Sequence, residues 1–233
     1  MRAVAILFDI DGTLISTGGA GARSWRWAFE RLFGIPADID SSSEAGMTDP
    51  EVARSTFRAV MRRRPRRDEI ARLMAAYLDR LPIEVETSTG YRVLDGVAEL
   101  LPRLRRDGFL LGITTGALEA AAHVKLARGN LNTFFSFGGY GSDSSDRAAL
   151  TGRAIERAGA ILGRSVDPGV VVVVGDTPLD VAAARAVGAT SIAVASGRYA
   201  RDELERSGAD HVLASLREPF PITADGRGPR PRP

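Results

Sequence analysis

The 233-residue chain contains no cysteine. This absence excludes disulfide bonds, catalysis by a thiolate and zinc sites built on cysteine. Long apolar runs are missing too. The longest purely aliphatic run, Val170–Val174, is far shorter than the roughly 20 residues of a membrane-spanning helix. The first residues lead into a strand pattern and not into the apolar segment of a signal peptide. We therefore expect a cytoplasmic protein without a membrane partner.

Lysine is almost absent, because Lys125 is the only one in the chain. The formal net charge is +2, and the whole excess lies in residues 217–233, where four arginines face two acidic residues. This segment is also rich in proline and glycine, so we expect a disordered tail at 217–233. Since the rest of the chain is balanced, the basic pI of about 9.4 gives little reason to expect a nucleic-acid partner.

What the chain does contain is a series of short apolar runs, at residues 3–8, 109–113, 170–174 and 191–195. Such runs, bounded by glycine and polar residues, are typical of strands buried on both faces. Helical patterns lie between them, at residues 97–106, 118–128, 148–162 and 179–187, with Asp95 as the expected cap of the first. This alternation predicts an α/β protein with a Rossmann-like, mostly parallel sheet flanked by helices.

Residues 17–88 interrupt the alternation with helical patterns alone, at 22–33, 50–62 and 68–80, followed by a hinge at 84–93. The second helix has a clear start, because Thr48 and Glu51 form a capping box around Pro50. We therefore predict an inserted α-helical cap at 17–88. The catalytic core is then formed by residues 1–16 and 89–216.

Acidic residues follow the first and third apolar runs, at the carboxyl ends of strands, where ligands bind to open parallel sheets. Asp9 and Asp11 are two residues apart on an extended chain and can face one site. Two carboxylates this close repel each other, and a divalent cation relieves the repulsion. Hard oxygen ligands favour magnesium. Asp176 follows the third run, and Asp180 lies in the first turn of the next helix, so we predict one Mg²⁺ site.

The second run ends at Thr115 and Gly116. A hydroxyl and free backbone N–H groups at the start of a helix suit phosphate oxygens, although this sequence also occurs as a simple strand-to-helix turn. Taken singly, Asp176 and Asp180 also have plain structural readings, as a solvated loop residue and as an acidic residue in a helix's first turn. Together with the Asp9 pair, they favour a metal site.

With these residues in view, the chain resembles the haloacid dehalogenase superfamily, in its phosphatase-type branch with a helical cap after the first strand. The resemblance rests on Asp9-Ile10-Asp11-Gly12-Thr13-Leu14 and Gly175-Asp176-Thr177-Pro178-Leu179-Asp180. It covers nearly the whole chain except the tail. The segment Gly46-Met47-Thr48-Asp49 is similar to a cap segment of phosphoglycolate-phosphatase-like members, which often carry arginine where Met47 stands.

The resemblance implies that Asp9 is the nucleophile that forms an aspartyl-phosphate. Asp11 would be the general acid and base, and its backbone carbonyl would ligate Mg²⁺. Asp9 and Asp176 would be carboxylate ligands of that ion, with Asp180 as a further ligand or a support. Thr115 and Gly116 would bind the phosphoryl group.

The family also places a cation beside the phosphoryl oxygens, usually a lysine. We favour Arg147, which lies where the family's cation usually stands, over Lys125, which lies inside a predicted helix. A guanidinium fork suits phosphate well. Arginine is mildly disfavoured in the first turn of a helix, which also favours a functional interpretation.

The resemblance predicts hydrolysis of a small phosphorylated metabolite. Asp11 argues against dehalogenation, since dehalogenases of this family lack the second aspartate, and a cap without lysine argues against phosphonatases. A phosphomutase of the β-phosphoglucomutase type stays open as the alternative. A binding module that uses the basic run 62–67 is a less favoured one, since a solvated turn explains that run. The sequence identifies neither the substrate nor an oligomeric state.

Overall fold

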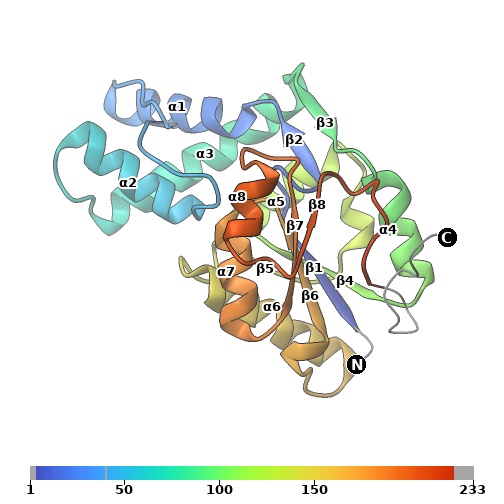
Figure 1. Ribbon diagram of the computed structural model, residues 1–233. Helices are drawn as coiled ribbons and strands as arrows, with labels where there is room; N and C mark the ends of the chain where they lie inside the picture. Colours follow the sequence, from blue (N-terminus) through green and yellow to red (C-terminus); the bar gives the residue numbers. More distant parts are fainter. Residues whose placement is uncertain (1–3, 40, 223–233) are drawn as a thin grey trace.

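The computed structural model describes residues 4–39 and 41–222. Its centre is a six-stranded sheet in which all neighbouring strands run parallel. In spatial order the strands are β5 (Gly138–Gly139), β4 (Leu110–Thr114), β1 (Ala5–Phe8), β6 (Val171–Gly175), β7 (Thr190–Val194) and β8 (His211–Leu213). Helices flank this sheet (Figure 1), so the predicted α/β fold is confirmed.

Each face of the sheet has its own apolar core. Ile6 and Phe8 of β1 belong to the cluster that includes α4 (Val97–Arg106) and α5 (Glu119–Ala127). Ala5 and Leu7 point the other way and belong to the cluster that includes α6 (Arg147–Leu162) and α7 (Pro178–Val187). Because both faces are covered, the central strands are apolar throughout, which explains the uninterrupted runs in the sequence. Short elements complete the core: η1 (Asn132–Phe134), η2 (Pro168–Val170) and α8 (Arg201–Arg206).

Three helices lie between the first strand and the rest of the core: α1 (Ala20–Phe33), α2 (Asp49–Met61) and α3 (Arg67–Thr87). The chain leaves the core through β2 (Ile15–Thr17) and returns through β3 (Tyr91–Val93), which pair antiparallel. Trp25 and Tyr77 stack inside this unit with ring centroids 4.2 Å apart. Figure 1 shows the three helices at the end of the sheet opposite the N-terminus, which is where the strands of the core end.

Two local predictions are wrong. Asp95 does not cap α4, because Gly96 takes the cap position with a φ of 86° and no side chain caps the helix. The third cap helix does not stop at Arg80. It continues through Pro82, and Glu84 lies 2.6 Å from Arg80 and 2.7 Å from Arg23. These ion pairs hold the last turns in place although proline removes one backbone donor.

The expected tail, 217–233, is only partly described. Within it, Phe220 is 4% exposed and joins the main apolar cluster. The order of the chain therefore extends further than its composition suggests, because an aromatic side chain has a large apolar surface to bury. Residues 223–233 lie outside the described residues. No helix in the described ranges is both long and apolar enough to cross a membrane.

Candidate active site

The candidate site lies where β1 and β6 end. The register pairs Phe8 with Val174, and the backbone N–H of Asp9 donates to the Val174 carbonyl at 2.8 Å. Asp9 and Asp176 therefore leave neighbouring strands side by side. Each offers a carboxylate oxygen that, together with one from Asp180, forms a cluster within 4.8 Å. Residues that are far apart in the sequence thus meet at the predicted edge of the sheet.

The start of α7 fixes the position of Asp180. The Thr177 hydroxyl accepts from the backbone N–H of Asp180 at 3.3 Å, and Asp180 Oδ2 accepts from the backbone N–H of Thr177 at 3.1 Å. The other carboxylate oxygen of Asp180 forms an ion pair with Arg147. Both oxygens are thus engaged by protein groups, which favours a supporting role for Asp180 over that of a direct metal ligand.

A glycine lets the loop after β1 close over Asp176. Gly12 has a φ of 83°, and a Cβ atom there would overlap the Asp176 carboxylate. The hydroxyl of Thr13, the next residue, donates to Asp176 Oδ1 at 3.3 Å. A side chain at position 12 would therefore both strain the backbone and displace the carboxylate. This contact explains why glycine follows the aspartate pair.

The buried carboxylates repel one another. Burial raises the pKa of Asp9, Arg147 opposes this rise, and the charge of Asp11 adds to it. Burial, with the charges of Asp9 and Asp11, raises the pKa of Asp176 to about 8. A nearby divalent cation would relieve this cost, and carboxylate oxygens are the ligands that Mg²⁺ prefers. The donor set therefore fits the predicted ion.

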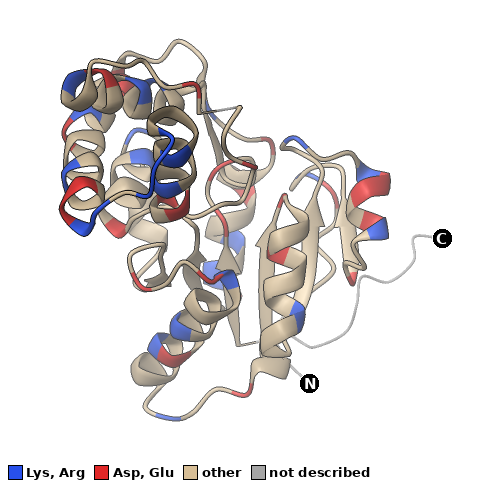
Figure 2. Cartoon of the chain, turned by 90° about the vertical axis from the view of Figure 1, so that its left-hand side faces the viewer, with Lys and Arg blue, Asp and Glu red and all other residues tan. Residues whose placement is uncertain are grey.

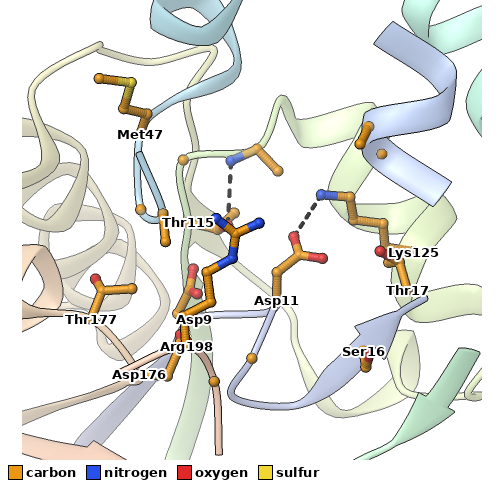
Figure 3. A pocket seen from close by; sticks show the side chains of 18 of the residues that line it. Asp9, Asp11, Ser16, Thr17, Met47, Thr115, Lys125, Asp176, Thr177 and Arg198 are labelled. Carbon is orange, nitrogen blue, oxygen red and sulfur yellow. Dashed lines mark hydrogen bonds and ion pairs between the residues drawn. The ribbon is translucent and has the colours of Figure 1, made fainter. Parts of the chain in front are cut away.

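The carboxylates open into a cavity of about 510 Å³ between the core and the cap. All of the predicted site residues except Asp180 line it, namely Asp9, Asp11, Thr115, Gly116, Arg147 and Asp176. Figure 3 shows Asp9, Asp11 and Asp176 at its floor, with Met47 from the cap on the opposite side. Such a volume suits a small metabolite.

The turn after β4 departs in part from the prediction. The side chain of Thr115 acts to lower the pKa of Asp9, and both residues line the same cavity. The backbone N–H of Thr115 is not free for phosphate, because it donates to the Gly139 carbonyl at 3.0 Å. The sequence signal for β5 is only two glycines, so this strand pairing could not be foreseen.

Gly116 lies against the cap. Its carbonyl accepts from the backbone N–H of Asp49 at 2.8 Å. A Cβ atom at Gly116 would come within 2.6 Å of the Met47 carbonyl oxygen. The absence of a side chain at position 116 therefore allows the cap segment to reach the core.

The two candidate cations lie beside different carboxylates. Arg147 is the first residue of α6, and its side chain is 10% exposed. It forms an ion pair with Asp180, and its Nη2 lies 3.6 Å from Asp9 Oδ1. Lys125 Nζ lies 2.6 Å from Asp11 Oδ2 instead (Figure 3). Both cations line the cavity, but Arg147 is the one beside Asp9.

Two residues make contacts that the sequence did not predict. The sequence places Asp49 in a helix start and in a cap segment similar to that of phosphoglycolate-phosphatase-like members, and the structure adds that its Oδ2 accepts from the backbone N–H of Leu118 at 2.8 Å across the cap–core boundary. Lys125 is 6% exposed and not solvated. The helical spacing gives a signal for Lys125, since it lies on α5 four residues after the buried Ala121. No comparable signal marks Asp49.

The basic run of the cap lies elsewhere. In Figure 1 the loop between α2 and α3 is at the edge of the cap farthest from the sheet, and Figure 2 shows the basic residues of the cap helices and their loop. Arg63 lies 2.6 Å from Glu69, and Arg66 lies 3.2 Å from Asp68. Arg62 and Arg64 line an outer hollow with their neighbours. This loop contributes no residue to the cavity.

Residues 4–188 match the family model of haloacid dehalogenase-like hydrolases, and the chain belongs to this family. The fold also resembles a predicted phosphatase from Clostridium acetobutylicum, with a TM-score of 0.70, 22% identity, and coverage of 94% of this chain and 96% of that chain. No curated protein matches the sequence.

Two further structures are similar at a TM-score of 0.72. One is a predicted phosphoglycolate phosphatase from Haemophilus somnus 129PT, 17% identical. The other is CbbY from Rhodobacter sphaeroides in complex with phosphate, 20% identical. Each comparison covers 93% of this chain and 96% of the other. At these identities, the likeness shows the shared fold.

Proposed function

We propose that the protein hydrolyses a small phosphomonoester by way of an aspartyl-phosphate on Asp9. One observation carries this proposal: Asp9, Asp176 and Asp180 converge at the end of the sheet, beside a cavity that also holds Asp11 and Arg147. This set supplies a nucleophile, a proton donor and acceptor, and a cation for the phosphoryl oxygens.

In the first step, a carboxylate oxygen of Asp9 attacks phosphorus. The bond from phosphorus to the ester oxygen breaks, and the departing alkoxide takes a proton from Asp11. Arg147 lies 3.6 Å from Asp9 and supplies positive charge next to the oxygens of the transferring group.

In the second step, a water molecule attacks the phosphorus of the aspartyl-phosphate. Asp11 takes the proton of this water, the bond between phosphorus and Asp9 breaks, and inorganic phosphate leaves with the Asp9 carboxylate restored. Asp11 thus acts first as acid and then as base, and the enzyme ends each turnover in its starting state.

Asp9, Asp176 and the backbone carbonyl of Asp11 would hold Mg²⁺, with Asp180 in support. When bound, the ion neutralises charge on the carboxylates and on the phosphoryl oxygens. The chain's own residues then bind the phosphoryl group and move the protons.

The cap is proposed to select the substrate, because Met47 and Asp49 line the cavity from its side. Met47 stands where phosphoglycolate-phosphatase-like relatives often carry arginine, which favours a substrate other than a small dianion of that kind. CbbY from Rhodobacter sphaeroides has been crystallised with xylulose-(1,5)-bisphosphate in a mutant form. We therefore place sugar phosphates among the first candidates, and the phosphomutase alternative stays a prediction.

The test is a screen of phosphate release from sugar phosphates, phosphoglycolate, nucleotides and an aryl phosphate, with Mg²⁺ and with EDTA. We expect release of phosphate in the presence of Mg²⁺ and none in the presence of EDTA. The Asp9→Asn variant should show none, because an amide is a poor nucleophile. Asp107→Asn, an exposed position on the core, is the matched control and should keep full activity. Release by Asp9→Asn at the wild-type rate contradicts the proposal, and conversion of a sugar phosphate to its isomer without release supports the phosphomutase.

A further inference from the structure

Lys125, the only lysine of the chain, is almost fully buried. It lies on α5 with Ala121, Ala122 and Leu126, all buried, and it is 6% exposed itself. Lysine is rarely buried to this extent unless its charge is paired. Its Nζ lies 2.6 Å from Asp11 Oδ2, so the ammonium is directed at the proposed acid and base and not at the nucleophile.

Asp11 depends on this contact for its position. Its side chain is 42% exposed, in a loop that has left β1. Among the described residues, Lys125 is the only side chain that forms a hydrogen bond or an ion pair with the Asp11 carboxylate. The Lys125–Asp11 ion pair therefore restrains a half-exposed carboxylate, and a poorly placed base loses much of its effect.

The cap holds Lys125 in turn. Asp49 of the cap accepts from the backbone N–H of Leu118 at 2.8 Å, and it lies close enough to Lys125 for its charge to raise the pKa of the lysine. Helix α3 of the cap, which carries the buried Tyr77, packs against α5. Burial alone would lower the pKa of Lys125, but the charges of Asp11 and Asp49 oppose it and the pKa is raised.

We propose that Lys125 is a positioning residue that holds the Asp11 carboxylate for the attack of water on the aspartyl-phosphate, and that Asp49 of the cap orients Lys125. The ion pair with the Lys125 ammonium fixes the direction of the Asp11 carboxylate, the group that takes the proton from water. The inference deepens the proposed function and rests on it. It also separates the two cations, since Arg147 binds the phosphoryl group and Lys125 places the base.

The experiment measures the two chemical steps separately, with a radiolabelled aryl phosphate. An aryl leaving group needs little help from an acid, so the formation of the phosphoenzyme does not depend on Asp11 as a proton donor. Rapid quenching gives the rate constant of formation, and a chase with unlabelled substrate gives the rate constant of hydrolysis. Asp11→Asn marks the full loss of the base, which is typically worth about 10²–10⁴-fold.

We expect Lys125→Met to slow hydrolysis of the phosphoenzyme by about 10- to 100-fold, part of the full loss of the base. Formation from the aryl phosphate should change by less than about threefold, so phosphoenzyme accumulates. Lys125→Arg should recover part of the loss, and Asp49→Asn should act in the same direction but more weakly. Hydrolysis at the wild-type rate, or equal slowing of both steps, would overturn the inference.

Two controls keep the result of this experiment interpretable. If Lys125→Met does not fold, Lys125→Arg and Asp49→Asn carry the same comparison of the two steps. In those variants, wild-type hydrolysis of the phosphoenzyme again rejects the role of Lys125. If the wild-type protein forms no phosphoenzyme at all, the proposed function has failed. If the wild-type protein forms a phosphoenzyme and the Lys125 variants hydrolyse it at the wild-type rate, the inference about Lys125 fails and the proposed function stands.

Discussion

Two regions of the molecule gather charges of one sign, and they differ in burial. Asp9 and Asp176 lie 6% and 4% exposed at the ends of adjacent strands. The run Arg62–Arg67 lies on an outer loop of the cap, in contact with solvent. Like charges crowd together in both regions, but burial raises the free-energy cost of that crowding.

Water screens the exposed arginines, and two of them also find acidic partners in Glu69 and Asp68. Among the buried aspartates, Asp9 has Arg147 at 3.6 Å, but Asp176 forms no ion pair with any described residue, and burial with the charges of Asp9 and Asp11 raises its pKa to about 8. A buried cluster that costs stability is a stronger sign of function than an exposed one that costs little. The comparison therefore favours the strand ends as the proposed site of chemistry and agrees with the prediction that the arginine run is a solvated turn.

The largest effect on the rate is expected from substitution of Asp11 in the buried cluster. We expect Asp11→Asn to lower kcat by about 10²–10⁴-fold, because it removes the proton donor and acceptor. Binding of Mg²⁺, followed by calorimetry, should stay nearly unchanged, since the backbone carbonyl is retained. Full activity in this variant would contradict the assignment of the acid and base.

Arg147 comes next. The loss of a charged hydrogen-bond partner costs about 1.5–3 kcal/mol, so Arg147→Ala should lower kcat/KM by about 10- to 100-fold. Most of this change is expected in KM, because the guanidinium binds the phosphoryl group. Arg106→Ala, an exposed position on α4, is the control. If kcat and KM both match the wild type, the phosphoryl-binding cation is Lys125.

A smaller effect links metal, pH and stability. The pKa of Asp176 is 3.8 in the absence of neighbours and about 8 in the folded protein. Its contribution to stability is therefore fully present below about pH 4 and is lost as pH rises through about 8. Mg²⁺ competes with the proton for the same oxygens, so its stabilising effect should grow over this range.

This link is measured as the shift in Tm on adding Mg²⁺, at several pH values. At a hundred times Kd, a ligand stabilises by about 2.7 kcal/mol, which is about 5–10 °C for a protein of this size. Asp176→Asn should remove both the pH dependence and most of the shift. A shift that is the same at low and high pH would contradict the account of the buried cluster.

The smallest effect tests the other half of the comparison. Arg64 has no ion-pair partner among the residues that the structure describes, and it lies on the exposed loop. Arg64→Ala should change the free energy of unfolding by no more than about 0.5 kcal/mol, with kcat/KM unaltered. A clear loss of activity would show that this loop takes part in the reaction.

Much of the fold could be predicted because local signals agreed with it. Uninterrupted apolar runs indicated strands buried on both faces, and the capping pattern at Thr48 and Thr177 placed the starts of α2 and α7. The continuation of α3 through Pro82 could not be foreseen, since the ion pairs of Glu84 depend on Arg23 of another helix. Local propensity carries no information on such partners.

The candidate site, like the fold, could be predicted only in part. Asp9, Asp11, Asp176 and Asp180 could be named because each follows or closely succeeds an apolar run. The contacts that connect cap and core could not, since Asp49 meets Leu118 only after the cap has folded back over the sheet. Similarly, the pairing of Lys125 with Asp11 spans 114 residues of sequence, and the helical spacing indicates only that Lys125 lies on a buried face.

The most direct measurement is to quench a single turnover with radiolabelled phosphomonoester and to find which residue carries the label. If Asp9 is the nucleophile of the carboxylate cluster, the phosphoryl group will be recovered on the peptide that contains Asp9, in a form that hydroxylamine cleaves. A turnover that releases phosphate while leaving the protein unlabelled at every quench time, or a label on any other side chain, contradicts it.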